Sequence, residues 1–91
     1  MTNLLRIFGS KAQTKLMQLL LEHRWRVYNQ AGLSRLLNLS PSTIARVIIP
    51  LIEEGIIKYE QIGGQMKIIA LNEESQKVKL IIDLYENLKN I

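Results

Sequence analysis

Hydrophobic residues recur every three or four positions over most of this chain, which is the spacing of amphipathic helices. The first such stretch predicts a helix from Lys11 to Glu22 or His23, with Ser10 as its N-cap. Residues 3–8 are apolar and end at a glycine, so we expect a single turn of helix lying on the core. The apolar stripe of the first long helix is Ala12, Leu16, Leu19 and Leu20.

A second helix is predicted over residues 30–37, with Asn29 as its N-cap. Residues 38–40 form the expected turn, in which Leu39 must point inward to hold the flanking helices at a fixed angle. Two helices joined by so tight a polar turn are typical of a helix-turn-helix.

The third helix, predicted over 41–54, has the clearest start and stop signals in the chain. Ser40 is the expected cap, Pro41 occupies the first helical position, and Gly55 ends the helix. Pro50 lies inside this helix and predicts a kink, or a last turn with a separate orientation. The predicted inward stripe is Ile44, Val47, Ile48, Leu51 and Ile52.

Strand-like composition appears in three places. Residues 24–28 predict a short extended segment, and residues 56–62 and 65–71 predict a hairpin over 56–71 with a two-residue turn at Gly63-Gly64. Asn72 is the expected N-cap of a last helix from Glu73 to about Asn90, with glutamates in its first turn and a lysine in its last. The chain is therefore predicted to be mainly α with a small β-hairpin (α+β).

This order of elements predicts a winged helix-turn-helix: a three-helix core, a β-hairpin wing and a C-terminal helix. We expect a DNA-binding domain over 1–72 and a dimerisation helix over 73–91. The last helix has two apolar rows. Either one row packs on the chain's own core and the other contacts a second copy of the chain, or the core is wide enough to contact both rows. The expected homodimer interface is Val78, Ile81, Tyr85 and Leu88, and the other row is Leu80, Leu84 and Ile91.

The amino-acid composition limits the kinds of site that the chain can form. The 91 residues include no cysteine and one histidine, so disulfides are excluded, no metal or other cofactor is expected, and nothing indicates an enzyme. There is no apolar run of membrane-spanning length and no signal-peptide pattern, so a cytoplasmic location is expected. Trp25 and Tyr28 are expected to pack beside the wing.

Charge is unevenly distributed along the chain. Residues 1–50 contain seven basic residues and one acidic residue, whereas residues 51–91 contain five basic and seven acidic residues. The basic half holds the helix-turn-helix, so double-stranded DNA is the expected partner, although each cation taken singly is more often an ordinary surface charge.

The outward side of the third helix supplies the candidate base contacts, Ser42, Thr43 and Arg46, because the start of this helix reaches base edges in helix-turn-helix proteins. The wing tip carries no arginine or lysine, so the wing contacts only the DNA backbone or no DNA at all. Candidate backbone contacts are Lys11, Lys15, Arg35 and Ser40, and candidate wing contacts are Lys58, Gln61, Gln65 and Lys67.

Three segments resemble winged helix-turn-helix transcriptional regulators of the broad ArsR/MarR-like type, particularly the small archaeal kind. They are FGSKAQTKLMQLL, LSRLLNLSPSTIARVIIPLIEEGII and YEQIGGQMKIIAL. The resemblance implies a dimeric repressor or activator whose third helix enters the major groove. It does not extend to metal sensing, because the cysteine and histidine ligands of metal sensors are missing. The alternative is a protein-interaction or assembly module that uses the exposed Ile49 and the last helix.

Overall fold

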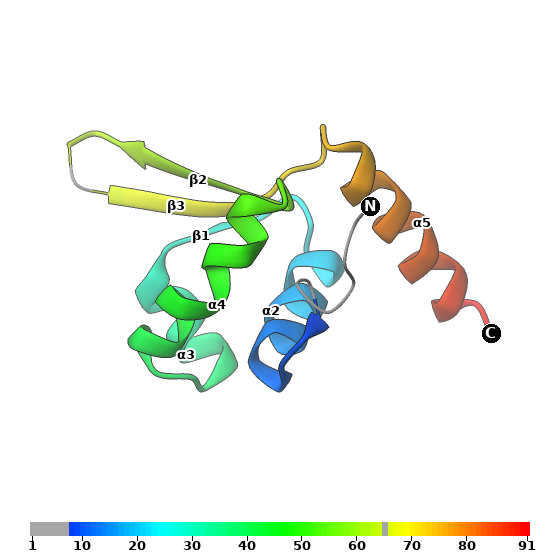
Figure 1. Cartoon of the computed structure of the whole chain (residues 1–91), viewed down its shortest axis with the longest axis horizontal. Helices are drawn as coiled ribbons and strands as arrows, with labels where there is room; N and C mark the ends of the chain where they lie inside the picture. Colours follow the sequence, from blue (N-terminus) through cyan, green and yellow to red (C-terminus); the bar gives the residue numbers. More distant parts are fainter. Residues whose placement is uncertain (1–7, 65) are drawn as a thin grey trace.

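The computed structural model describes residues 8–64 and 66–91, and it has the winged helix-turn-helix fold (Figure 1). Apart from Phe8, the helical turn predicted over 3–8 lies outside the described residues. The elements in chain order are α2 (Lys11–Glu22), β1 (Val27–Tyr28), α3 (Gln30–Leu37), α4 (Pro41–Glu53), β2 (Ile57–Ile62), β3 (Met66–Leu71) and α5 (Gln76–Lys89).

One hydrophobic core joins α2, α3, α4 and the root of the sheet. Leu16, Leu20, Leu33, Ile44 and Ile69 are completely buried in it. The predicted N-caps Ser10, Asn29 and Ser40 are confirmed, since each side chain accepts a hydrogen bond from a backbone N–H in the first turn of its helix. Within the described residues, no single helix is long and apolar enough to cross a membrane; α3 and α4 meet that test only together, across a sharp bend.

The helix-turn-helix is fixed by how α3 ends. Asn38 has a left-handed conformation with φ 55°, and the Leu39 N–H donates to the Ser34 carbonyl at 3.1 Å. This is a Schellman ending, and Leu39 packs against the core as predicted. The chain then turns through 108° into α4, within the range of helix-turn-helix pairs. Gln30 Nε2 donates to the Pro41 carbonyl at 2.8 Å, so the starts of α3 and α4 are joined directly.

Helix α4 continues through Pro50 to Glu53 as one element. Its inward residues Ile44, Val47, Ile48 and Leu51 are buried, but Ile52 is partly exposed, so its assignment to the inward stripe was wrong. The buried stripe is narrower than predicted, because the core covers the side of α4 that carries the four buried residues and does not extend around the helix to Ile52. At its end the Ile56 N–H donates to the Leu51 carbonyl at 2.9 Å, and Gly55 has φ 73°.

The sheet has three antiparallel strands in the order β1-β3-β2. Val27 pairs with Ala70, which makes the predicted extended segment a third strand. Ile62 pairs with Met66, so three residues connect β2 to β3, and the prediction of a two-residue turn was wrong. Both glycines of this connection have positive φ, as a sharp reversal requires.

Helix α5 begins three residues later than predicted. Its N-cap is Ser75, whose hydroxyl accepts from the Val78 N–H at 3.4 Å, and not Asn72. Asn72 instead donates from Nδ2 to the Gly55 carbonyl at 3.1 Å, which ties the end of β3 to the end of α4. The glutamates 73 and 74 therefore precede the helix and act through ion pairs, whereas Lys89 does lie in the last turn.

The apolar residues of α5 divide into a buried row and an exposed row. Val78 is fully buried in the chain's own core, and Ile81, Ile82 and Tyr85 pack against it. The exposed row is Leu80, Leu84, Leu88 and Ile91. Figure 1 shows the C-terminal end of α5 projecting away from the rest of the molecule, which leaves this row uncovered.

Candidate nucleic-acid interface

The exposed side of α4 is opposite its buried stripe. Ser42, Ala45, Arg46 and Ile49 are exposed on it, and Thr43 is half-buried. Two of the three predicted base-contacting residues, Ser42 and Arg46, therefore lie on an open helical surface. Thr43 lies at the edge of that surface.

Three hydroxyl groups meet at the start of α4. Ser40 Oγ accepts from the Thr43 N–H at 3.2 Å and lies 2.8 Å from Thr43 Oγ1 and 3.1 Å from Ser42 Oγ. Ser40 is thus the structural cap of α4 in addition to its predicted role at the DNA backbone. Ser40 and Ser42 are exposed, whereas Thr43 is half-buried with its hydroxyl turned toward the cap.

Arg46 is exposed in the second turn of α4 and makes no ion pair with any described residue. A guanidinium in this position keeps its planar set of donors available, and that set matches the O6 and N7 acceptors of guanine. Arg46 is the residue of the candidate interface best suited to recognise a base.

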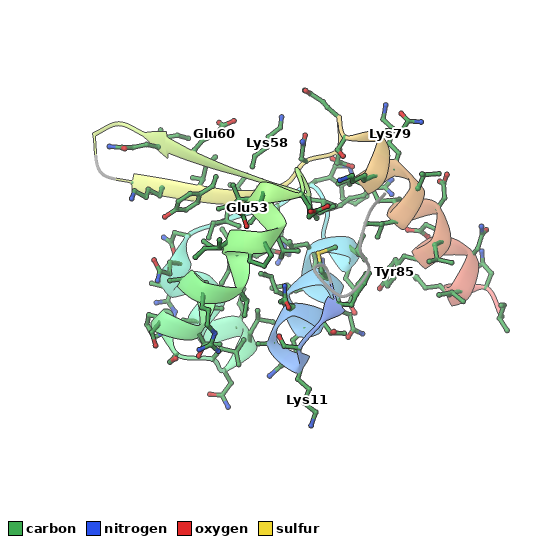
Figure 2. All side chains as sticks on the ribbon, viewed as in Figure 1. Lys11, Glu53, Lys58, Glu60, Lys79 and Tyr85 are labelled. Atoms are coloured by element: carbon green, nitrogen blue, oxygen red, sulfur yellow. The ribbon has the colours of Figure 1, made fainter. Side chains whose placement is uncertain are left out.

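The predicted backbone contacts occupy different environments. Lys15 Nζ donates to the Leu37 carbonyl at 2.7 Å, so its charge caps the C-terminal end of α3. Arg35 is exposed in the last turn of α3. Lys11 is exposed at the end of the molecule away from the wing, as its label and those of Lys58 and Glu60 show in Figure 2. Lys11 and the wing therefore cannot lie on the same small patch.

The predicted wing contacts also differ in position and in partners. Lys58 is opposite Ala70 near the root of the hairpin, and its ammonium lies 3.5 Å from Glu74 Oε1. Lys67 is nearer the tip, and its ammonium lies 5.6 Å from the centre of the Tyr59 ring. Gln61 Nε2 donates to the Gly64 carbonyl, and Gln65 lies outside the described residues. Lys67 is therefore the cation of the wing that remains available near its tip.

A shallow hollow of about 440 Å³ separates the start of α3 from the wing. Gln30 lines it on the helical side and Lys67 on the wing side. The hollow makes the surface between the helix-turn-helix and the wing concave.

Ion pairs of the described part of the chain gather around α5 and the turn before it. Arg24 lies 3.4 Å from Glu73 and 4.0 Å from Glu86, and Lys77 lies 2.9 Å from Glu54. In contrast, no ion pair with a described residue involves the cations of the helix-turn-helix and the wing tip, Lys11, Lys15, Arg35, Arg46 and Lys67. Ion pairing thus neutralises cations around α5 and leaves these five cations without an ionic partner among the described residues.

One aromatic residue is not packed as the sequence predicts. Tyr28 is buried as predicted, but Trp25 is 76% exposed, with the Arg24 guanidinium 4.8 Å from its ring centre. The surface of the wing tip is apolar, which the sequence alone did not predict. Ile62 and Met66 are both at least half exposed there. The strict alternation of faces in the hairpin register is the signal that could have placed this pair.

No group of histidine, cysteine or acidic side chains suited to a metal ion occurs among the described residues. No protein-family model matches the chain, and no curated protein is similar to it in sequence. Its similarity to known proteins is therefore one of structure.

Three solved structures have the same fold over almost the whole chain. HlyU from Vibrio cholerae matches with a TM-score of 0.71 at 24% identity, covering 93% of this chain and 86% of HlyU. A possible transcriptional regulator from Methanosarcina mazei matches with a TM-score of 0.71 at 23% identity, covering 93% and 81%.

The third is MepR, a transcription regulator of the Staphylococcus aureus multidrug efflux pump MepA. It matches with a TM-score of 0.68 at 16% identity over 96% of this chain, which spans 65% of MepR. The resemblance inferred from the sequence motifs is confirmed for the fold: the chain is a winged helix-turn-helix protein with the architecture of these regulators.

Proposed function

We propose that this protein is a transcriptional regulator that binds double-stranded DNA sequence-specifically as a dimer, without catalysis. Helix α4 enters the major groove, and Ser42, Thr43 and Arg46 contact base edges. The observation that carries this proposal is the open side of α4, where the exposed Arg46 has no ionic partner among the described residues. Such a role places the protein in the cytoplasm, in contact with the chromosome.

The distribution of charge supports this orientation on DNA. Arg35 in the last turn of α3 and Lys67 of the wing are proposed phosphate contacts, together with the wing residues Gln61 and Gln65. Lys11, Lys15 and Ser40 add contacts from the helical body. Lys58 contributes less, because Glu74 already neutralises it.

Dimerisation is the second part of the proposal. Val78, Ile81 and Tyr85 face the chain's own core, so the interface moves to the exposed row of α5, of which Leu88 is the one residue shared with the interface predicted from sequence. The three leucines of this row on α5, with Ile91 just beyond the end of the helix, are better covered by a second copy than left in water. A two-fold dimer presents two α4 helices to half-sites about one helical turn, roughly 34 Å, apart.

A charge placed in this row tests the dimer. Leu84→Glu should convert the full-length protein from dimer to monomer in sedimentation analysis at micromolar concentrations. Leu36→Glu is the matched control, because Leu36 and Leu84 are both leucines with 58% exposure and lie on different helices. A wild-type protein that is already monomeric would refute the dimer.

Salt dependence of DNA affinity tests the binding function. Affinity for a random duplex should fall steeply as salt rises, because each neutralised phosphate releases counterions. Arg35→Gln and Lys67→Gln should each reduce the log–log slope by about one. Lys79→Gln is the control, since Lys79 is exposed on α5, away from the proposed interface (Figure 2).

The alternative function is a protein-interaction or assembly module that uses the exposed Ile49 together with α5. It predicts no measurable affinity for duplex DNA even at low salt, so the same titration separates the two functions. The unpaired cations around α4 favour DNA, because an apolar protein partner would have to cover Arg46 at the cost of removing its charge from water.

A further inference from the structure

The open side of α4 contains one large exposed apolar side chain, that of Ile49. At about 100° per residue, Ser42, Ile49 and Glu53 lie along the midline of the exposed side, with Arg46 on one flank and Ala45 on the other. Ile49 is 54% exposed, although the buried stripe of α4 is complete without it. A β-branched aliphatic side chain therefore lies on the midline of the exposed side, three residues beyond Arg46.

Double-stranded DNA offers one apolar group in the major groove, the C5 methyl of thymine. An arginine beside an aliphatic side chain matches a guanine close to a thymine, because the guanine supplies two acceptors and the thymine supplies a methyl group. Ala45 is small enough to let a base approach on the flank opposite Arg46.

We propose that Ile49, supported by Ala45, determines specificity by contacting the methyl group of a thymine close to the guanine bound by Arg46. The proposal rests on the DNA-binding function proposed above and adds the composition of the half-site. Arg46 and Ile49 are three residues apart, about 4.5 Å along the helix, compared with 3.4 Å between stacked base pairs. The thymine therefore lies within two base pairs of the guanine.

The test uses a duplex selected by the full-length protein from a random pool. Loss of preference in Arg46→Ala identifies the guanine position. Each thymine within two base pairs of that guanine is then replaced by uracil, which removes the C5 methyl and leaves the hydrogen-bonding groups in place. For the wild-type protein, one replacement should weaken binding by about three- to fivefold, the value of one buried methyl group.

The variant Ile49→Ala should bind the thymine and uracil duplexes with nearly equal affinity, whereas Ile49→Val should keep part of the difference. Val27→Ala is the matched control: Val27 is a β-branched residue 60% exposed on β1, and its variant should retain the full wild-type difference. Circular dichroism verifies that each variant is folded.

Two results would overturn the inference. One is a wild-type protein that does not distinguish uracil from thymine at any of these positions, and the other is an Ile49→Ala variant that discriminates as well as the wild type. Either result leaves the DNA-binding function standing, provided that a sequence was selected and depends on Arg46. Failure to select any sequence would instead overturn both proposals.

Discussion

The ammonium of Lys15 on α2 donates a hydrogen bond of 2.7 Å to the carbonyl oxygen of Leu37, the last residue of α3. Carbonyls at the end of a helix have no partner within the helix and carry the negative end of its dipole. Lys15 therefore stabilises the helix-turn-helix from outside it, at the point where the chain turns toward α4.

Lys15→Met should lower the free energy of unfolding by about 1 kcal/mol, because it removes a hydrogen bond from a charged donor at a partly exposed site. Lys11→Met is the matched control on the same helix and should change stability by less than about 0.5 kcal/mol. Urea denaturation measures both. Equal stability of the two variants would mean that the Lys15 contact contributes nothing in solution.

Arg46→Ala should weaken binding to a selected duplex by about 1–3 kcal/mol and broaden sequence preference, because a bidentate contact to guanine is lost. Arg26→Ala, which changes an exposed arginine in the turn before β1, should leave sequence preference intact. Fluorescence anisotropy with selected and random duplexes measures the difference. Equal losses on both duplexes would reduce Arg46 to a phosphate contact.

Gly55→Ala should destabilise the protein by about 1–2 kcal/mol, because Gly55 has φ 73° and an alanine in that conformation is strained. Crowding is not the reason, since a Cβ built at this position meets no atom within 4 Å. Gly55→Asn should lose less stability, because asparagine tolerates the left-handed region. Thermal unfolding compares the two variants.

Tyr85 should ionise at a higher pH than a free tyrosine. Partial burial against the core raises the pKa of its phenol, and the carboxylates of Glu22 and Glu86 raise it further. Figure 2 shows Tyr85 on the side of α5 that faces α2. The neutral phenol therefore favours the folded state below the pKa of unfolded tyrosine, and this stabilisation is lost as the pH rises through the higher folded pKa.

NMR titration of the Tyr85 ring carbon measures this value. Glu22→Gln should lower the pKa toward that of free tyrosine, because it removes one of the two carboxylates. Asp83→Asn, on the same helix, is the charge control, since Asp83 is not a source of the shift. An unchanged pKa in Glu22→Gln would exclude the proposed electrostatic contact.

Local signals predicted the helical part of the fold well. Ser10, Asn29 and Ser40 cap their helices because a hydroxyl or amide oxygen before a helix satisfies a free backbone N–H without help from the rest of the molecule. The inward stripe of α4 was correct for four of its five residues for a similar reason, because helical spacing determines which side chains share a face.

The features that could not be predicted from the sequence depend on tertiary contacts. Asn72 has the right side chain to cap α5, but its amide bonds the Gly55 carbonyl instead, and Ser75 takes the capping role. Two apolar rows on α5 look equivalent in the sequence, and the burial of Val78 in the core decides which row remains exposed. Within the candidate site, the pairing of Lys58 with Glu74 similarly depends on a long-range contact.

The contacts around the turn between β3 and α5 would determine the distance between the two DNA half-sites that a dimer prefers. Asn72 joins that turn to the end of α4, and Lys77 in the first turn of α5 pairs with Glu54 at the same end. These contacts tie the helix that would hold the second copy to the end of the helix that would enter the groove. Inserting one residue at 73–74 would alter this connection between the two helices. The preferred distance between half-sites would then change, while the bases preferred within each half-site would stay the same.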